Sequence, residues 1–502
     1  MSRRSLAARN GARSRAAAWP RRAFLEGLAA AGAVGCGAGE AGAIAPEASS
    51  GSTSEDPSPG TSTGEVLGSS TTGVDESSSE ASDGSSSSGG ASVDGPLNIV
   101  FITADDLGWK ALEAHGTLEH CPNLRRFASE SRTYTRAFNV TSSCSSSRAS
   151  FATGRFPSEH GVRGLVHRFP ELSLPADAFT VARALSEAGY RTAIAGKFHI
   201  SDDETASSFG YTDVGPRRVK EESNLEFAFD FIARNDEQPF FLELNFTQTH
   251  RRGSPRRFPM HEDHPVSVDD VEVPAYWALP DRPEIRECLA GYLSQFCSMD
   301  ALIGRVLDEL RDAELLDTTL VLFVSDNGVS FPNNKTTLYD RGIGSPCVVH
   351  DPRKQGGVEV TDLVASIDYA ATILDAAGLD PAAVRGVPLG ERRSEFIFAE
   401  MYRHASQIGM RAVRSDRWKF IANVTTDPIG SGEVSEEWEQ TLEQRPWREE
   451  RPTFELYDLE ADPHEQQNLM LEQGDVAQEL YDALAQHADQ VEDEEPLPPL
   501  TS

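Results

Sequence analysis

Two acidic pairs in the sequence have the chemistry of a site for a hard metal ion. They are Asp105-Asp106 and Asp326-Asn327. Either pair alone would more commonly form a turn or cap a helix. Together they supply oxygen ligands that suit Ca²⁺ or Mg²⁺ and not a thiophilic metal. Each pair directly follows a run of β-prone apolar residues, so the sequence predicts a divalent-cation site where two strands end.

A single cysteine, Cys144, lies in a run of small residues that is followed by Arg148 and, later, by Gly154. If a helix begins here, Cys144 sits near its positive end, where N–H groups and the helix dipole favour an anion. A lone cysteine is more commonly a small buried hydrophobe. The other polar residues favour a reactive group instead.

Positively charged or protonatable side chains follow other predicted strands or strand-to-helix loops: Arg148, Lys197, His199, His250 and Lys335. A lone lysine is usually a solvated surface charge, and a lone histidine usually has a structural hydrogen bond. The set as a whole would create local positive potential, which is what stabilises a reacting anion.

The elements that position these residues alternate between strand and helix. Continuous apolar runs at 97–103 and 319–325 predict strands buried on both faces, 240–246 predicts another strand and 191–195 a shorter one. Segments 178–188, 289–315 and 365–377 read as helices. The alternation predicts an α/β fold with a mostly parallel central sheet flanked by helices, in which sites lie at the carboxyl ends of the strands.

The pattern changes after about residue 385. Segments 396–401, 409–414, 418–424 and 454–459 read as short strands, and 476–491 reads as a helix. We therefore predict a catalytic domain over 96–385, a small antiparallel C-terminal subdomain over 386–493 and a frayed acidic tail over 494–502.

The amino-terminal region resembles an export signal sequence. Arg21-Arg22 precede a short apolar run that ends at Cys36, as in a bacterial twin-arginine signal with a lipobox. An ordinary basic signal with a chance cysteine is the alternative. Residues 37–95 are rich in Gly, Ser and acids and predict a flexible tether. We expect 1–36 to be the signal and the mature protein to be periplasmic or at the cell surface, anchored to a membrane by lipid on Cys36.

Charge and cysteine spacing exclude several classes of protein. The formal charge is −33, and without the first 36 residues, which hold seven arginines and one acid, it is −39. Such a body does not bind nucleic acid non-specifically and repels polyanions at long range. The six cysteines are far apart, with neither metal-ligand spacing nor a readable disulfide framework. We interpret Cys121, Cys288, Cys297 and Cys347 as core thiols, and His261 and His264 as surface residues of a polar loop.

The site residues and their order resemble the sulfatase family of the alkaline phosphatase superfamily. The matching stretches are Thr103-Ala104-Asp105-Asp106, Cys144 to Gly154, Gly196-Lys197-Phe198-His199, Ser325-Asp326-Asn327-Gly328, 335–340 and 455–463. Segments 331–343 and 410–421 look most like the branch that contains heparan N-sulfoglucosamine sulfohydrolases. The resemblance extends from about residue 98 to residue 469.

The resemblance implies a mechanism. Cys144 would be oxidised to formylglycine by a formylglycine-generating enzyme, and its hydrate would be the nucleophile. One Ca²⁺ would bind Asp105, Asp106, Asp326, Asn327 and the modified Cys144. Arg148 would orient the nucleophile, and Lys197, Lys335 and His250 would neutralise sulfate oxygens, with His250 or Lys335 assisting the leaving group. His199 would take a proton from the second hydroxyl.

The modification motif departs from the family's pattern at one position. Cys-x-Pro-x-Arg is usual and alanine sometimes replaces the proline, but here Ser146 stands in that place. The predicted function is hydrolysis of sulfate esters or sulfamates of sulfated carbohydrates, as in glycosaminoglycan degradation. The alternatives are a phosphodiesterase or phosphonate hydrolase of the same superfamily, and a catalytically silent lipoprotein that binds sulfated glycans.

Overall fold

The computed structural model describes residues 95–108, 121–202, 204–217, 221–234, 238–252, 258–277, 279–391, 395–426 and 450–500. All of them belong to one compact unit. The predicted signal, 1–36, and the predicted tether, 37–95, lie outside these ranges except for Gly95. None of the helices in the described ranges is both long and apolar enough to cross a membrane.

An eight-stranded sheet forms the centre of the fold, with strand order β5-β4-β6-β1-β7-β8-β2-β9. The pairs among β5, β4, β6, β1 and β7 are parallel, whereas β8 runs antiparallel to both of its neighbours. The predicted mostly parallel sheet is thus confirmed. The strands are β1 (Asn98–Ala104), β2 (Arg132–Tyr134), β4 (Arg191–Gly196), β5 (Asp213–Val214), β6 (Phe240–Phe246), β7 (Thr319–Ser325), β8 (Cys347–His350) and β9 (Val358–Val360).

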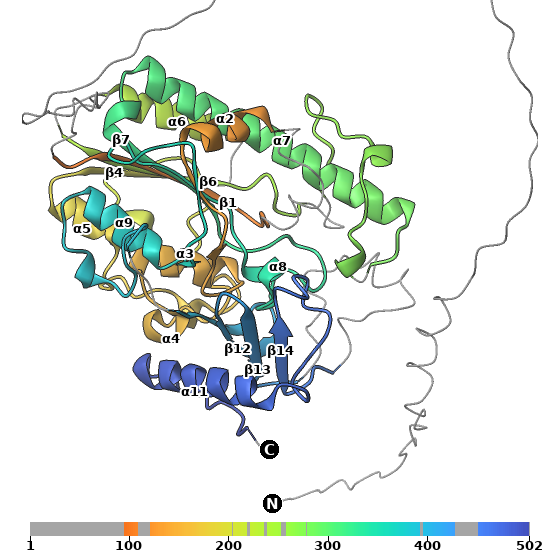
Figure 1. Ribbon diagram of the computed structural model, residues 1–502. Coiled ribbons are helices and arrows are strands. Elements are labelled where there is room, and N and C mark those ends of the chain that lie inside the picture. The colour runs from red at the N-terminus through yellow and green to blue at the C-terminus, as the bar shows by residue number, and fades with distance from the viewer. Residues whose placement is uncertain are drawn as a thin grey trace, which may run out of the picture. The chain divides into compact units, whose positions relative to one another are not determined.

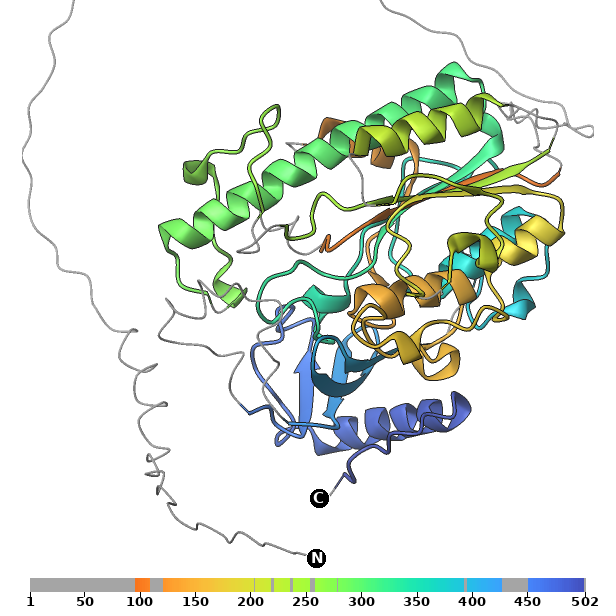
Figure 2. The same ribbon diagram turned by 180° about the vertical axis from the view of Figure 1, so that it is seen from behind.

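Helices cover both faces of this sheet (Figures 1 and 2). On one face pack α2 (Pro122–Glu130), α6 (Glu221–Ala233) and α7 (Pro283–Asp312), and on the other pack α3 (Cys144–Thr153), α5 (Val181–Glu187) and α9 (Asp368–Ala376). Successive residues of β1 alternate between the two cores, with Val100 and Ile102 in the first and Ile99 and Phe101 in the second. Burial on both faces explains why the strand reads as a continuous apolar run.

A second sheet and short elements complete the unit. Strands β11 (Ile397–Arg403), β12 (Gln407–Arg414), β13 (Trp418–Asn423) and β14 (Phe454–Asp458) form an antiparallel sheet. The helix α11 (Gly474–Gln490) covers one of its faces. The remaining elements are β3 (Ala137–Phe138), β10 (Val364–Ala365), α4 (Pro157–His160), α8 (Asp340–Ile343) and the 3₁₀ turns Pro170–Leu172, Ala206–Phe209, Val268–Asp270, Ala275–Trp277, Leu316–Thr318 and Pro381–Ala383.

Buried ion pairs join the two sheets. Asp340 of α8 binds Arg414 of β12 (3.0 Å) and Lys419 of β13 (2.8 Å), and Lys419 also binds Glu465 (2.9 Å). Removing one partner from such a buried network leaves an uncompensated charge, which is far more costly than losing a surface pair. The C-terminal sheet is therefore fixed against the part of the chain that carries α8.

Three expectations differ from the structure. The helix predicted at 365–377 begins only at Asp368, because Val364 and Ala365 pair with β3. The helix predicted at 289–315 begins six residues earlier, at Pro283, which suits the first turn of a helix. The tail predicted to fray is packed up to residue 500, because Arg411 binds Glu495, and Leu497 and Leu500 pack against the apolar cluster of the C-terminal sheet and α11.

Gly196 ends β4 and determines where Lys197 emerges. Its φ is +91°, and a Cβ there would lie 2.1 Å from the carbonyl oxygen of Asn245 in β6. Gly189 has the same backbone conformation (φ +92°) with open space around it. Both need glycine for conformational reasons, but only Gly196 needs it for packing.

We predict that Gly196→Ala destabilises the fold more than Gly189→Ala does. Each substitution carries the cost of a left-handed alanine, about 1–2 kcal/mol. Gly196→Ala also pushes β4 away from β6, which adds about 1–3 kcal/mol. Urea unfolding of both variants measures the difference, and equal destabilisation would show that the contact of Gly196 with β6 imposes no constraint.

Candidate active site

The two acidic pairs meet at the carboxyl edge of the central sheet, because β1 and β7 are parallel neighbours whose last residues are aligned. The backbone N–H of Asp106 donates to Oδ1 of Asp326 (3.0 Å), and the side-chain amide of Asn327 donates to Oδ1 of Asp106 (2.8 Å). Asp106 reaches these partners at φ 61°, in the left-handed region. Asp105 and these three residues are at most 1 % exposed, so negative charge is concentrated in the interior.

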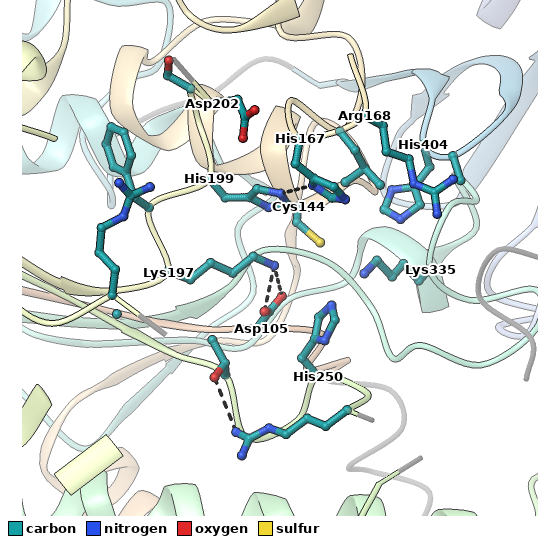
Figure 3. Close-up of a pocket in the computed structure, with 18 of the residues that line it drawn as sticks. Asp105, Cys144, His167, Arg168, Lys197, His199, Asp202, His250, Lys335 and His404 are labelled. Carbon is teal, nitrogen blue, oxygen red and sulfur yellow. Dashed lines mark hydrogen bonds and ion pairs between the residues drawn. The ribbon is translucent and has the colours of Figure 1, made fainter. Parts of the chain in front are cut away.

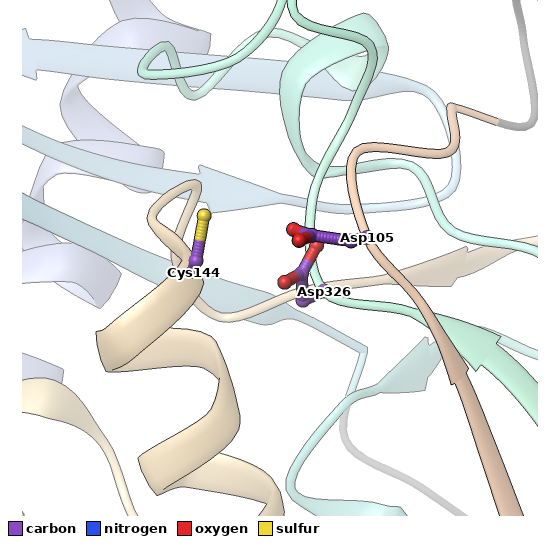
Figure 4. Close-up of side chains that lie close together, drawn as sticks. All are labelled: Asp105, Cys144 and Asp326. Carbon is purple, nitrogen blue, oxygen red and sulfur yellow. The ribbon is translucent and has the colours of Figure 1, made fainter. Parts of the chain in front are cut away.

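Cys144 is the first residue of α3, and its side chain faces the carboxylates (Figure 4). Its Sγ lies 3.9 Å from Oδ1 of Asp106. One ligand atom each from Cys144, Asp105 and Asp326 lie within 4.8 Å of one another. Burial raises the pKa of the Cys144 thiol to about 12. An unmodified Cys144 is therefore a protonated thiol and a poor nucleophile.

Serine hydroxyls hold the first turns of α3 in a buried position. Ser147 Oγ donates to the carbonyl of Thr141 (3.2 Å), and Ser145 Oγ accepts from the N–H of Val166 (3.3 Å). The helix ends at Gly154, at φ 62°, where a Cβ would clash with Val384. Small side chains with local hydrogen-bond partners thus allow the helix start to approach the carboxylates.

Each buried carboxylate has a close cationic partner, and the three cations come from three different segments. Figure 3 shows the pair between Lys197 and Asp105. The contacts are Lys197 Nζ to Asp105 Oδ2 (2.8 Å), Lys335 Nζ to Asp106 Oδ1 (2.8 Å) and Arg148 Nη2 to Asp326 Oδ2 (2.9 Å).

The carboxylates differ in how well their charge is compensated. Burial by itself raises the pKa of Asp105, but Lys197, His250 and Arg148 outweigh it and hold that pKa well below its usual value. Burial and the neighbouring Asp105 raise the pKa of Asp326 to about 7 despite its pair with Arg148. The protein cations alone therefore leave Asp326 incompletely neutralised.

The site also fits a divalent cation by its unsatisfied atoms. Oδ2 of Asp106 and Oδ1 of Asn327 are buried and have no hydrogen-bond partner among the described residues. Buried polar atoms of native proteins are normally satisfied. Oxygen ligands of this type suit Ca²⁺ or Mg²⁺, so the residues present match the predicted metal.

Two histidines stand at the opening. His250 Nδ1–H donates to the carbonyl oxygen of Arg251 (2.8 Å), and Nε2 lies 4.0 Å from Oδ2 of Asp106. His199 Nε2 lies 2.9 Å from His167 Nδ1. Burial, aided by the positive charges of Lys197 and Arg148, lowers the pKa of His199 well below its usual value. His199 is therefore neutral and able to accept a proton.

One cavity of about 550 Å³ holds most of the predicted set (Figure 3). A volume of this size matches small-molecule sites. Its lining includes Asp105, Cys144, Lys197, His199, His250 and Lys335. Arg148, Asp106, Asp326 and Asn327 lie beneath these residues and hold them through the contacts described above.

Several residues of the site escaped the sequence analysis. The amide oxygen of Asn245, near the end of β6, accepts from Nη1 of Arg148 (2.9 Å), and its position near a strand end was a usable signal. His404, from the C-terminal sheet, lies with Nδ1 2.9 Å from Oγ of Ser143, directly before Cys144. Neither His404 nor His167 belongs to a recognisable motif.

The residues left outside the site are also outside the cavity. His261 and His264 are half-buried, with ring centroids 5.1 Å apart. Cys121 and Cys347 are buried, Cys288 and Cys297 are half-buried, and none of these four cysteines forms a disulfide.

Known proteins are similar to this chain in sequence and in fold. A family model described as "Sulfatase" matches residues 97–379. Human N-sulphoglucosamine sulphohydrolase is 29 % identical over 437 residues, covering 74 % of this chain and 86 % of the relative. The ulvan-active sulfatase of Formosa agariphila is 26 % identical over 436 residues, covering 74 % and 71 %. A structure solved with its substrate D-glucosamine-2-N,6-O-disulfate is 18 % identical, with a TM-score of 0.59 and coverage of 80 % and 99 %, and shares the fold.

The helix that carries Cys144 rests on a buried neutral histidine, His160. Its Nε2 lies 3.0 Å from Oγ of Ser150 in α3, and its Nδ1 accepts from the N–H of Val162 (3.1 Å). Burial, aided by Arg163, lowers the pKa of His160 to about 3. In the unfolded chain this histidine binds a proton near the ordinary histidine pKa of about 6.5.

We predict that His160 makes the fold acid-sensitive. The stability that neutral His160 contributes is complete above about pH 6.5 and is lost as the pH falls toward about 3. Only the unfolded chain binds the proton in that window, so the free energy of unfolding falls by about 1.4 kcal/mol for each pH unit. Urea unfolding of wild type and His160→Gln between about pH 7 and 4.5 tests this. The free energy of unfolding should depend less on pH in the variant than in the wild type. An equal pH dependence in both proteins would refute the assignment.

Proposed function

This chain belongs to the sulfatase family, and from that membership we propose that it hydrolyses sulfate esters or sulfamates of sulfated carbohydrates with a formylglycine formed from Cys144 and one bound Ca²⁺. The observation that carries the proposal is the juxtaposition of Cys144, at the start of α3, with three buried carboxylates and two lysines, at the floor of one cavity that Asp105, Cys144 and both lysines line.

One group of residues in the site would bind the metal ion, and another would bind the anionic sulfate group. Asp105, Asp106, Asp326 and Asn327 would hold the Ca²⁺, with the modified residue 144 completing the set. When bound, the ion lowers the pKa of a hydroxyl nucleophile and withdraws charge from the sulfuryl group. Arg148 keeps Asp326 in place through Nε and Nη2, both 2.9 Å from Oδ2.

The remaining cations would contact the substrate. Lys197 and Lys335, which bind carboxylates in this structure, have ammonium groups that sulfate oxygens would share. His250 presents Nε2 to the cavity and, with Lys335, is placed to assist the leaving group. His199 is neutral and accepts the proton whose removal expels sulfate.

Conversion of Cys144 has a structural requirement. Cys144 is 1 % exposed and Ser146, which stands where the family usually has proline, is 2 % exposed. A formylglycine-generating enzyme reads this segment in extended form, so it would have to act before α3 folds. Small side chains around Cys144 leave room for such binding.

The two alternatives fit the site less well. Among the described residues, both groups of side chains close enough to hold a metal share Asp105, so they form one metal locus rather than the two of a bimetallic phosphatase. A silent glycan-binding protein would need neither buried metal ligands nor the neutral His199.

The substrate is proposed to be the terminal residue of a short glycan. The cavity, about 550 Å³, accommodates a sugar residue and not a long chain, and the acidic body disfavours a dense polyanion at long range. The named N-sulphoglucosamine relative supports a glycosaminoglycan sugar. Internal cleavage of long chains would contradict this assignment.

The predicted location completes the proposal. Lipid on Cys36 would anchor the protein, after export, to a membrane through the 37–95 tether. These residues lie outside the described ranges. Unchanged membrane association of a Cys36→Ala variant would refute the anchor.

We predict that residue 144 of protein from the native host is an aldehyde. Replacing CH₂SH by CHO makes the peptide about 18 Da lighter than its thiol form. Mass spectrometry of the tryptic peptide measures this shift, and the peptide that contains Cys347 serves as the internal thiol control. A wholly unmodified Cys144 would exclude the formylglycine mechanism.

We further predict metal-dependent turnover of sulfate over phosphate. Purified protein should hydrolyse an aryl sulfate faster than the matching aryl phosphate, lose activity to a chelator and regain it with Ca²⁺, because the ion supports the nucleophile. A panel of N- and O-sulfated glucosamines then identifies the natural linkage. Faster phosphate turnover would favour the phosphodiesterase alternative.

A further inference from the structure

Within the described ranges, His167 is the imidazole that contacts His199, although no sequence motif marks it. His167 Nδ1 and His199 Nε2 are 2.9 Å apart (Figure 3). The ring planes differ by 19° and the centroids are 5.1 Å apart. That separation is what two nearly coplanar rings require when they share one in-plane hydrogen bond. The two side chains therefore meet edge to edge, with one nitrogen of each ring engaged.

The hydrogen bond determines which nitrogen of His199 is left for chemistry. Nδ1 of His199 is buried and has no hydrogen-bond partner in the described part of the chain. His199 and His167 both line the cavity that contains Cys144. The tautomer of a histidine is set by the hydrogen bond that its other nitrogen makes. If Nε2 of His199 carries the proton and donates it to His167, Nδ1 is an unprotonated base.

His199 needs such an external restraint. Its backbone lies at φ 55°, in the left-handed region, and it follows the glycine turn at the end of β4. Among the side-chain hydrogen bonds of the described residues, the one with His167 is the one that orients its ring. Without it, the ring could rotate and present either nitrogen.

The segment that carries His167 is itself anchored at several points. The N–H of Val166 donates to Oγ of Ser145 in α3 (3.3 Å). The guanidinium of Arg403 lies over the ring of Phe169 (5.2 Å), and that of Arg163 lies over the ring of Tyr402 (4.9 Å). His167 is therefore held between the cysteine-bearing helix and the C-terminal sheet, although its own side chain is exposed.

We infer that His167 is a positioning residue, which fixes the ring orientation and tautomer of His199 and so leaves Nδ1 as the unprotonated base. This inference rests on the base role given to His199 in the proposed function. The groups around His199 favour its neutral form, since Lys197 and Arg148 are positive and outweigh Asp105. His167 then accepts at Nδ1.

Two substitutions at residue 167 separate positioning from other roles. Asn offers a side-chain oxygen near the place of imidazole Nδ1, whereas Ala offers nothing. We expect His167→Ala to lower kcat for an aryl sulfate about 10- to 100-fold, the usual effect of losing such a supporting hydrogen bond, with KM within about twofold. His167→Asn should recover most of kcat. His264→Ala, which removes a half-buried imidazole outside the cavity, is the matched control.

Other results would overturn the inference. An unchanged kcat in His167→Ala would show that the hydrogen bond is dispensable. A raised KM with unchanged kcat would make His167 a substrate contact, and failure of His167→Asn to recover activity would exclude positioning by hydrogen bonding. Thermal unfolding of each variant verifies that the fold is intact.

A measurement without turnover distinguishes failure of this inference from failure of the proposed function. In protein labelled with ¹⁵N-histidine, the His199 signals, identified by their loss in His199→Gln, should report a neutral ring protonated at Nε2. In His167→Ala they should shift to a tautomer mixture. A fixed tautomer in both proteins would overturn the inference whether or not the protein is a sulfatase.

Discussion

Three carboxylates buried together at the end of two parallel strands are the constraint on which the rest of this structure depends. Like charges at such short distances in a low-dielectric interior repel strongly, and each also loses hydration. One cationic side chain pairs with each carboxylate: Lys197 with Asp105, Lys335 with Asp106 and Arg148 with Asp326. The raised pKa of Asp326 and the unsatisfied oxygens of Asp106 and Asn327 indicate that these cations compensate the negative charge incompletely. A divalent cation bound here would supply the positive charge that is missing.

The same constraint explains the composition of α3. A helix start can approach the carboxylates only if its side chains are small, and the serines that follow Cys144 meet that condition while finding local hydrogen-bond partners. Arg148, one turn further on, reaches back to Asp326 and to Asn245. The helix thus brings a positive terminus, a modifiable side chain and a guanidinium to one point.

The C-terminal sheet belongs to the site as well as to the scaffold. Its His404 binds Ser143, the residue before Cys144, and Arg403 packs over the segment that carries His167. The buried network of Asp340, Arg414, Lys419 and Glu465 fixes this sheet in place. An active site assembled from residues between 105 and 335 is therefore completed by the last quarter of the chain.

The sequence by itself predicted the strands and the polar residues that gather at their carboxyl ends. Continuous apolar runs predicted β1 and β7, whose two faces are both buried, a largely apolar run predicted β6, and the polar residues at their ends were recognisable as a set. Only the tertiary structure decided which cation meets which carboxylate, and that His167, Asn245 and His404 join the site. Those contacts link segments between 32 and 261 residues apart, and a pairing over such distances depends on strand order and loop packing, which local residue patterns do not encode.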